Sequence, residues 1–344
     1  MSIIYTLLII AVLVLAHEWG HFIVARRIGI PVHEFALGFG YKLFSVTKNG
    51  VEYSFRLIPL GGFVRMAGED YGDDFTDAAG YSSRTPLEKI SVAFAGPFMN
   101  FVLAIVIFII IYAFVGIPNP TEAPILGQVM EDKPAYSAGL LENDKITEVA
   151  GVKVNSWQEF TDIISTTEAG TSLEILVNRN NELITVVVIP EFDKGSNSTI
   201  IGVLPLVNYD KQSILTAIGL GLQQTYELTT LLLAALWTLV TGGASMQDLA
   251  GPVGITKLVG EVAQIGWIFL LNFAAFLSIN LGILNLLPIP ALDGSKIVFA
   301  TIEGVRKKPI SPEKEGFIHW LGFLFLMLLI VVVTYNDILR LFKG

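Results

Sequence analysis

Two histidines and a glutamate form the sharpest chemical signal in the sequence, in the stretch His17-Glu18-Trp19-Gly20-His21. Residues four apart lie on the same face of a helix, so both imidazoles can bind one metal ion. Glu18 follows the first histidine, where its carboxylate can take a proton from metal-bound water. The chain has only four histidines, so this spacing seldom arises by chance. The stretch therefore predicts a zinc-dependent hydrolase.

The motif lies in an apolar segment that begins at Ser2, and no lysine or arginine precedes Arg26. A signal peptide usually has a basic start and a cleavage site between small residues. Here the start is not basic and the apolar run continues directly into the motif, so we predict a retained membrane helix over residues 1–29. Histidines and a glutamate inside a span are costly unless they are paired or bound. A bound metal satisfies them, and a polar cluster between helices is the alternative.

A catalytic zinc site needs a third protein ligand and an open position for water. The chain has no cysteine, so that ligand must be a histidine or a carboxylate. Asp293 is the strongest candidate, because it ends a long uncharged run in which Pro288 and Pro290 interrupt the helix. Irregular backbone at membrane depth occurs where it lines a cavity. The alternatives are that Asp293 caps the following helix and that His33 or His319 is the ligand.

The composition is typical of a polytopic membrane protein. Hydrophobic residues make up 53% and charged residues 15% of the chain, whereas a soluble domain carries about a quarter charged residues. The net charge of −9 argues against a nucleic-acid partner, because nucleic acids select basic surfaces. Four segments exceed the roughly 20 residues that a helix needs to cross a bilayer; they cover residues 2–25, 90–117, 262–292 and 316–335.

The segment 214–240 is apolar but carries two glutamines and Glu227, so it fits a helix on the membrane surface as well as a span. Basic residues gather at 26–89 and at 306–308. The positive-inside rule places both groups on the cytoplasmic side, which four spans allow and five do not. We therefore predict four spans, with both chain termini and the middle of the chain outside.

Two further segments have recognisable patterns. Residues 42–66 predict a β-hairpin, because Asn49-Gly50 is a strong two-residue turn signal, and Gly61-Gly62 indicates the next turn. Residues 121–210 have ordinary soluble composition and the length of one small domain. In that domain we expect strands and a helix at 173–178, 184–189 and 156–164.

The predicted fold is a polytopic α-helical membrane protein with about four transmembrane helices, a small membrane-associated β-sheet and one inserted α+β domain. The expected parts are transmembrane helix 1–29, a cytoplasmic loop with the β-hairpin at 30–87, transmembrane helix 88–118, the inserted domain 119–210, an amphipathic helical segment 211–255, a third transmembrane segment 256–300, a cytoplasmic loop 301–315, and the fourth helix with the C-terminus at 316–344.

Three motifs together resemble the site-2 proteases, a family of intramembrane zinc metalloproteases. They are His17-Glu18-x-x-His21, Phe94-Ala95-Gly96-Pro97-x-x-Asn100 and Asn285-x-x-Pro288-x-Pro290-x-Leu292-Asp293-Gly294. A fourth, Gly251-Pro252-Val253-Gly254-Ile255, is similar to the bacterial branch of the regulator of sigma-E protease type. The resemblance covers essentially the whole chain. One departure is that the inserted segment has room for one PDZ domain, where the enterobacterial type has two in tandem.

The resemblance implies roles for individual side chains. Zinc would bind His17, His21 and Asp293, with Glu18 as the base. Substrate contact or polarisation of the substrate carbonyl is implied for two asparagines, Asn100 and Asn285. The inserted segment would be a PDZ domain facing the periplasm or cell exterior, and the hairpin region would be a membrane-associated sheet that presents an edge to substrate.

The expected activity is cleavage of single-span membrane proteins, such as anti-sigma factors or remnant signal peptides, in the bacterial plasma (inner) membrane. The PDZ domain would lie outside and the active site would open towards the cytoplasm. Membrane lipid is the expected surrounding, and no nucleic acid is expected to bind. Two other classes compete: a catalytically inactive membrane scaffold that binds through its PDZ domain, and a metal-ion transporter. A transporter needs ligands along several spans, whereas the candidates here gather at one point.

Overall fold

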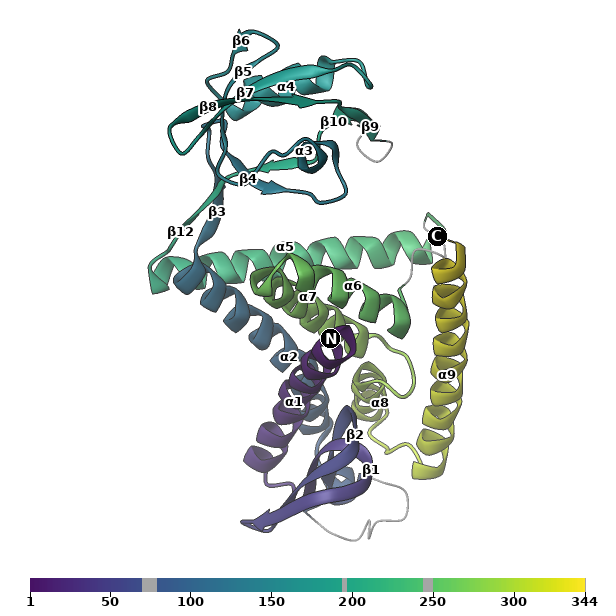
Figure 1. Ribbon diagram of the computed structural model, residues 1–344. Helices are drawn as coiled ribbons and strands as arrows, with labels where there is room; N and C mark the ends of the chain where they lie inside the picture. The colour runs from purple at the N-terminus through teal and green to yellow at the C-terminus, as the bar shows by residue number, and fades with distance from the viewer. Residues whose placement is uncertain (70–78, 194–196, 244–249, 344) are drawn as a thin grey trace. The chain divides into compact units, whose positions relative to one another are not determined.

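The structure is a computed structural model that describes residues 1–69, 79–193, 197–243 and 250–343. These residues divide into two compact units (Figure 1). Unit 1 consists of Met1–Ala113 and Ser213–Gly344, and unit 2 consists of Phe114–Gln212. Unit 2 is therefore inserted into the sequence of unit 1.

Unit 1 is mainly helical. Its helices are α1 (Ser2–Ile28), α2 (Pro86–Ile110), α5 (Ile214–Val240), α6 (Pro252–Ile265), α7 (Trp267–Leu286), α8 (Asp293–Arg306) and α9 (Pro312–Lys343), with a 3₁₀ turn at Tyr81–Ser83. A π-helical turn at Ile111–Val115 follows α2 and crosses the boundary to unit 2. Four described segments are long and apolar enough to cross a membrane, namely Ser2–Ile28, Pro86–Val115, Trp267–Leu286 and Glu313–Arg340. The predicted number of spans is thus confirmed.

The third predicted segment is not one continuous helix. Helix α6 ends before Gly266, which has a φ of 150° and a ψ of 164°, a backbone conformation that glycine adopts more readily than other residues. Helix α7 ends where Leu287 becomes extended, with a φ of −64° and a ψ of 142°. Leu287 precedes Pro288, and the ring of a proline disfavours the helical conformation in the residue before it. The candidate span is therefore the 20-residue helix between these two breaks.

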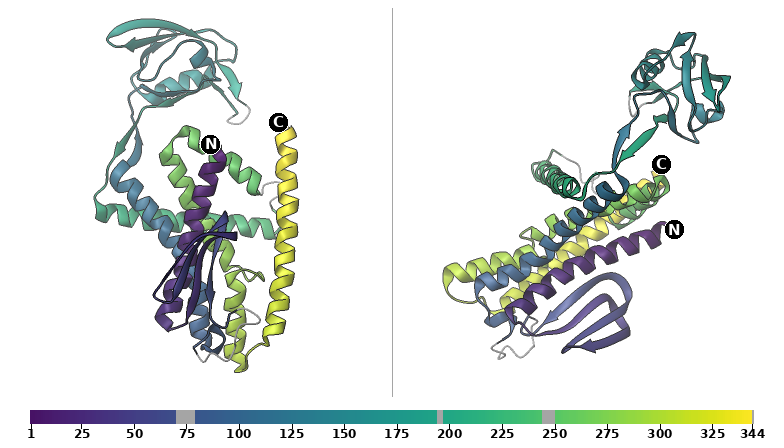
Figure 2. Two further views of the ribbon diagram at one scale, coloured as in Figure 1. Left: turned by 60° about the horizontal axis from the view of Figure 1, so that its bottom comes forward. Right: turned by 90° about the vertical axis from the view of Figure 1, so that its left-hand side faces the viewer.

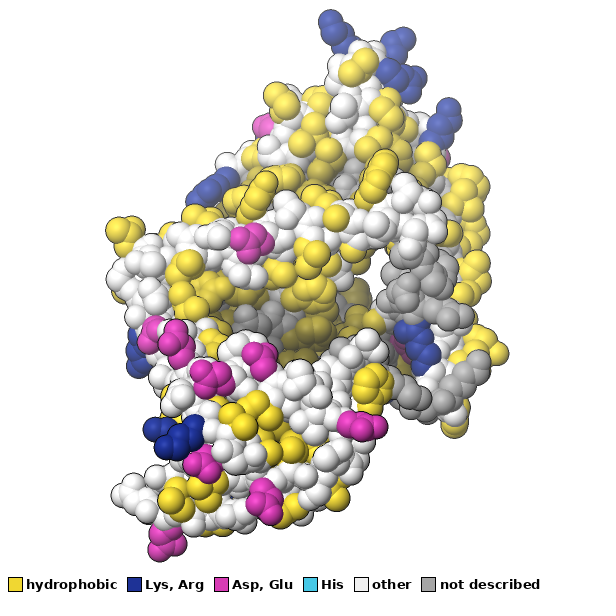
Figure 3. All heavy atoms as spheres, turned by 90° about the horizontal axis from the view of Figure 1, so that it is seen from above, with side chains coloured by type: hydrophobic (Ala, Val, Ile, Leu, Met, Phe, Trp, Pro, Cys, Tyr) yellow, Lys and Arg dark blue, Asp and Glu magenta, His cyan; other side chains and the backbone are white. Residues whose placement is uncertain are grey.

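Helix α5 has 27 residues but is not one of the four candidate spans among the described helices. Several of its large apolar side chains are exposed, including those of Leu215, Tyr226 and Trp237. Figure 3 shows hydrophobic side chains at the surface, among polar and charged ones. Large exposed apolar side chains along one helix mark contact with lipid or with another protein.

The core of unit 1 lies where α1, α2, α6 and α7 pack together (Figure 2). Its buried residues include Leu13 of α1, Phe108 of α2, Val259 of α6 and Ile279 of α7. Helix α2 begins with a capping box, in which Thr85 and Glu88 satisfy each other's backbone N–H groups. The capping box thus sets the point at which α2 begins.

The only strands that the structure describes in unit 1 form one long hairpin, β1 (Val32–Lys48) and β2 (Val51–Met66). Its turn is Asn49-Gly50, with φ values of 52° and 78°, as the turn signal predicted. Glu34 is buried in the sheet and accepts hydrogen bonds from Ser54 and Arg56 at 2.5 and 2.7 Å. Burial opposes the charge of the carboxylate, but these two donors hold the pKa of Glu34 below its usual range.

The hairpin folds over on itself. Residues 34–37 pair with residues 62–65 on one side and with residues 52–55 on the other. The predicted turn at Gly61-Gly62 is wrong, because β2 continues through both residues. The strand bends near this point, where Gly61 has a φ of 141°. Residues 62–65 have no second strand partner among the described strands, so they form an edge of the sheet.

Unit 2 is an α+β unit. Its strands are β3 (Ile117–Pro120), β4 (Leu126–Val129), β5 (Lys145–Val149), β6 (Val152–Lys153), β7 (Leu173–Arg179), β8 (Glu182–Val188), β9 (Glu191–Asp193), β10 (Ser198–Ile200), β11 (Val203–Pro205) and β12 (Val207–Asp210), and its helices are α3 (Pro134–Ser137) and α4 (Trp157–Thr166). Strands β6, β5, β7 and β8 form one antiparallel sheet in that order. The predicted strands and helix correspond to β7, β8 and α4.

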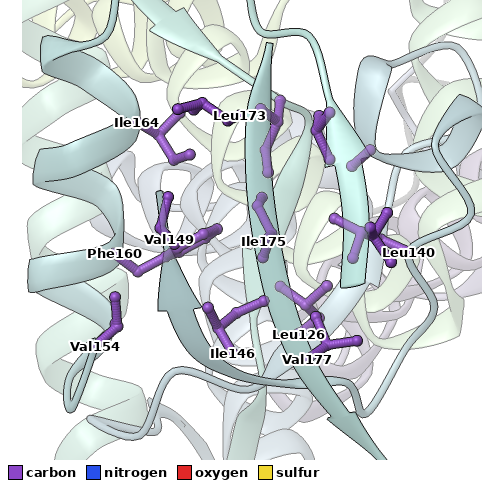
Figure 4. Packing of buried hydrophobic residues seen from close by; sticks show 14 residues of the cluster. Leu126, Leu140, Ile146, Val149, Val154, Phe160, Ile164, Leu173, Ile175 and Val177 are labelled. Atoms are coloured by element: carbon purple, nitrogen blue, oxygen red, sulfur yellow. The ribbon is translucent and has the colours of Figure 1, made fainter. Parts of the chain in front are cut away.

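The core of unit 2 lies between α4 and this sheet (Figure 4). Phe160 and Ile164 of α4 point towards Val149 of β5 and Ile175 of β7. Alternate residues of β7 are buried, as expected for a strand with one face on a core. Unit 2 thus has a hydrophobic core of its own.

Ile175→Ala should destabilise unit 2, because Ile175 is 0% exposed and its truncation leaves a cavity that costs about 2–5 kcal/mol of unfolding free energy. Chemical denaturation of the isolated segment 114–212, followed by circular dichroism, measures the change. Leu183→Ala on β8 is the control, because this side chain is 64% exposed. Equal losses in the two variants would contradict the assignment of the core.

Candidate metal centre

Three side chains from two helices meet inside unit 1. His17 and His21 lie one turn apart on α1, and Asp293 is the first residue of α8. Asp293 Oδ2 is 3.0 Å from His17 Nε2 and 3.4 Å from His21 Nε2, and the two Nε2 atoms are 3.2 Å apart. All three residues are buried. The three donor atoms therefore converge on one point.

The other ring nitrogen of each histidine also has a partner. His21 Nδ1 lies 2.7 Å from the carbonyl oxygen of Val92 on α2. A carbonyl oxygen only accepts, so His21 carries its proton on Nδ1 and leaves Nε2 free for a metal. His17 Nδ1 lies 3.1 Å from the side-chain amide of Asn100, also on α2. Both imidazoles are thus oriented from α2.

The amide of Asn100 indicates how His17 would bind a metal. Asn100 is fully buried, and its Oδ1 atom has no hydrogen-bond partner among the described residues. A histidine that binds a metal through Nε2 donates its Nδ1–H. A half-turn of the Asn100 amide exchanges its oxygen and nitrogen and places the unpaired oxygen opposite this donor. In that orientation Asn100 Oδ1 would accept from His17 Nδ1–H, which is the arrangement that a metal on His17 Nε2 requires.

The donor set fits zinc. Two imidazole nitrogens and one carboxylate oxygen are a common protein ligand set for catalytic zinc, with a fourth position left open. The described part of the chain contains one such group of histidine and acidic residues, and it is His17, His21 and Asp293. These residues would hold the ion.

Two glycines allow α1 and α2 to approach closely enough for this geometry. A Cβ atom on Gly20 would overlap the carbonyl oxygen of Ala95. A Cβ atom on Gly96 would overlap the ring of His21 at Nε2 and crowd that of His17. Only a residue without a side chain fits at these two positions.

Asp293 reaches the centre because the chain turns sharply after α7. Gly294 lies so close to the end of α7 that a Cβ atom there would overlap the carbonyl oxygens of Leu286 and Leu287. One turn further along α8, Lys296 Nζ is 2.7 Å from Glu69 Oε1. This ion pair connects α8 to the segment that follows β2.

Glu18 lies close to the sheet. It follows His17 on α1, and a Cβ atom on Gly62 would lie 3.3 Å from Glu18 Cγ. Gly62 belongs to the edge formed by residues 62–65. A carboxylate is therefore placed beside the candidate metal site and next to a strand edge.

The other candidate residues lie outside this group. His33 is exposed in β1, and His319 lies on α9, where it accepts a hydrogen bond from the backbone of Ala291. Asn285 is the penultimate residue of α7. The sequence reasoning missed Gly20 and Lys296, because their importance depends on partners far away in the sequence.

A buried His-His-Asp group beside a glutamate, in a unit with four candidate spans, defines a membrane-embedded hydrolase that uses zinc. Known proteins agree. Peptidase family M50 matches residues 5–329 of the chain. The zinc metalloprotease RasP of Oceanobacillus iheyensis and the regulator of sigma-W protease RasP of Bacillus subtilis are each 36% identical, with 99% of this chain and 99% of the relative covered. A putative zinc metalloprotease of Clostridium perfringens is 37% identical, with 98% and 99% covered.

The chain belongs to Peptidase family M50, the site-2 protease family expected from the motifs. It is a multi-pass membrane zinc metalloprotease. Part of the chain is similar to the PDZ domain of the SdrC-like protein from Listeria innocua, at 30% identity, covering 24% of this chain and 92% of that domain with a TM-score of 0.22.

Gly96→Ala should lower the zinc content of the purified protein, because the added methyl group occupies the place of the His21 ring. Metal analysis of the protein in detergent measures the zinc stoichiometry. Gly219→Ala on α5 is the matched control, since nothing lies within 4 Å of its Cβ position. Unchanged zinc in Gly96→Ala would show that α2 does not constrain the two imidazoles.

Proposed function

We propose that the protein cuts single-span membrane proteins within or beside the bilayer, with His17, His21 and Asp293 as zinc ligands and Glu18 as the general base. The observation that carries this proposal is the convergence of the three donor atoms beside Glu18 on α1, which is itself a candidate span.

Zinc bound at this group would supply Lewis acidity, which polarises a peptide carbonyl and makes water more acidic. Glu18 would accept the proton of the attacking water and return it to the leaving amine. Asn100 would keep His17 oriented by accepting its Nδ1–H. Asn285, at the end of α7, would donate hydrogen bonds to the substrate carbonyl.

The sheet provides a place to hold substrate. A helical span hides its peptide carbonyls in intrahelical hydrogen bonds, so a substrate must unwind before it is attacked. A free strand edge binds an extended peptide through backbone hydrogen bonds, and residues 62–65 form such an edge next to Glu18. The exposed apolar side chains of Tyr41, Phe44 and Leu57 support a position of this sheet at the membrane surface.

Membership of the family supports a proposal for the substrates and the cellular setting. The Bacillus subtilis relative is named a regulator of sigma-W protease, and for this chain we propose anti-sigma factors and remnant signal peptides as substrates. We place it in the bacterial plasma (inner) membrane, with residues 30–87 and 301–315 in the cytoplasm. Unit 2 would be a PDZ domain on the outer side, and the active site would open towards the cytoplasm.

A catalytically inactive PDZ scaffold is the main competing function. The intact set of His17, Glu18, His21 and Asp293 weighs against it, because a binding scaffold does not need a base beside three buried metal-binding groups. A metal-ion transporter is disfavoured because the described ligand-type residues form one group.

Glu18→Gln should retain zinc and lose proteolysis, because the amide keeps the shape of the side chain but cannot accept a proton. Loss of a general base costs about 10²–10⁴-fold in rate. Cleavage of a model single-span substrate in detergent, together with metal analysis, measures both quantities. Glu182→Gln, an exposed change in unit 2, is the control. Cleavage by Glu18→Gln at the rate of the control would refute the assignment of the base.

The topology can be tested by cysteine labelling, since the chain has no native cysteine. A cysteine at Ser165 on α4 should react with a membrane-impermeant thiol reagent added to intact cells. A cysteine at Ser45 in β1 should react only after the cells are permeabilised. Both positions are exposed, so access to the reagent depends on the side of the membrane. The opposite labelling pattern would show that the orientation is reversed.

A further inference from the structure

The loop that leads into Asp293 contains a strained residue. Residues 287–292 connect α7 to α8, and Ala291 in this loop has a φ of 78°. This is the left-handed region, which residues with a side chain adopt only when surrounding contacts hold them there. Inside the loop, the N–H groups of Ile289 and Leu292 donate to the carbonyls of Leu287 and Ile289, whereas Ala291 donates its N–H to a partner outside the loop.

That partner is α9. His319 Nδ1 accepts a hydrogen bond of 3.0 Å from the backbone N–H of Ala291. The ring of His319 also lies edge-on against Phe299 of α8, with 5.5 Å between the ring centroids. One turn further along α9, a Cβ atom on Gly322 would overlap the carbonyl oxygen of Pro290. The helix and the loop therefore touch backbone to backbone.

Helix α9 has few other attachments within unit 1. Only 11% of the residues in its apolar 18-residue stretch are buried, compared with 28–33% for the corresponding stretches of the other three candidate spans. At its far end, Asp337 accepts hydrogen bonds from the N–H groups of Gly251 and Gly254 at 3.2 and 2.8 Å. One end of α9 therefore meets the loop through His319 and Gly322, and the far end is held at the start of α6.

We propose that His319 is a positioning residue that sets Asp293 for zinc binding, so that the metal centre is complete only while α9 is docked on the loop. This inference rests on the proposed role of Asp293 as the third ligand. Ala291 lies two residues before Asp293, so a change in its backbone conformation shifts the start of α8. His319 itself is outside the group of three metal-binding side chains. Its Nδ1 atom accepts from Ala291, so the proton of the neutral ring is on Nε2.

Two substitutions of His319 separate the hydrogen bond from ring packing. His319→Asn keeps an acceptor at the same number of bonds from Cα, whereas His319→Phe keeps a ring against Phe299 and has no acceptor. We expect full-length His319→Phe in detergent to bind zinc about 10–100-fold more weakly, the usual loss when a supporting partner of a metal ligand is removed. His319→Asn should stay close to the unmodified protein. Competition with a chelator measures the affinity.

The absorption spectrum of the cobalt-substituted protein reports the geometry of the ligands and is a readout that does not depend on activity. It should change in His319→Phe and be retained in His319→Asn.

A second pair of variants tests the docking of α9 without changing His319. Gly322→Ala forces α9 away from Pro290 and should also weaken zinc binding. Gly316→Ala is the matched control on the same helix, because nothing lies within 4 Å of its Cβ position. If His319→Phe does not fold, the comparison of Gly322→Ala with Gly316→Ala tests the proposal in its place.

Unchanged zinc affinity and cobalt spectrum in His319→Phe would overturn the proposal. So would equal losses in His319→Phe and His319→Asn, or in the two glycine variants. Asp293→Ala distinguishes this failure from failure of the proposed function. If Asp293→Ala keeps full zinc, the ligand set is wrong; if it loses zinc while His319→Phe and Gly322→Ala do not, only the positioning role fails.

Discussion

The close approach of α1 to α2 is the constraint on which the metal centre depends. Helices surrounded by lipid gain little from hydrophobic burial against each other, so small residues at their interface, which let the backbones approach, contribute much of the packing. Gly20 and Gly96 serve this purpose here. A wider separation would take His21 away from the carbonyl of Val92 and His17 away from Asn100.

Polar groups inside membrane helices need partners, and here hydrogen bonds and ion pairs supply them. The two imidazoles share Asp293, and each has a second partner on α2. Ser278 of α7 donates a 2.8 Å hydrogen bond to the backbone carbonyl of Asn100. Lys89 and Glu303 form a further ion pair, at 2.8 Å, between α2 and α8. An isolated member of this network would be costly in an apolar medium, so the network holds the helices in one arrangement.

The sequence predicts those parts of the site that depend on local spacing. His17, Glu18 and His21 share one helix, and Asp293 stands at the end of an uncharged run beside two prolines. The proximity of Glu18 to Gly62 and the hydrogen bond between His319 and Ala291 join distant segments, and no local pattern encodes them.

The same reasoning explains which parts of the fold could be predicted. Four spans follow from length and hydropathy, and the hairpin turn follows from Asn49-Gly50. The break at Gly266 has no such signal, because glycine is frequent inside membrane helices. The folding over of the hairpin depends on pairing between residues 34–37 and 52–55, whereas a turn motif specifies only its own two central residues.

The inserted unit begins and ends with strands that pair with each other. Ile117 of β3 faces Asp210 of β12, and Pro120 faces Val207, so the chain enters and leaves the unit at neighbouring points. An insertion with adjacent ends imposes no distance on its host, whatever its length. A change in the length of the inserted unit would therefore leave the connection between the helices of unit 1 unchanged.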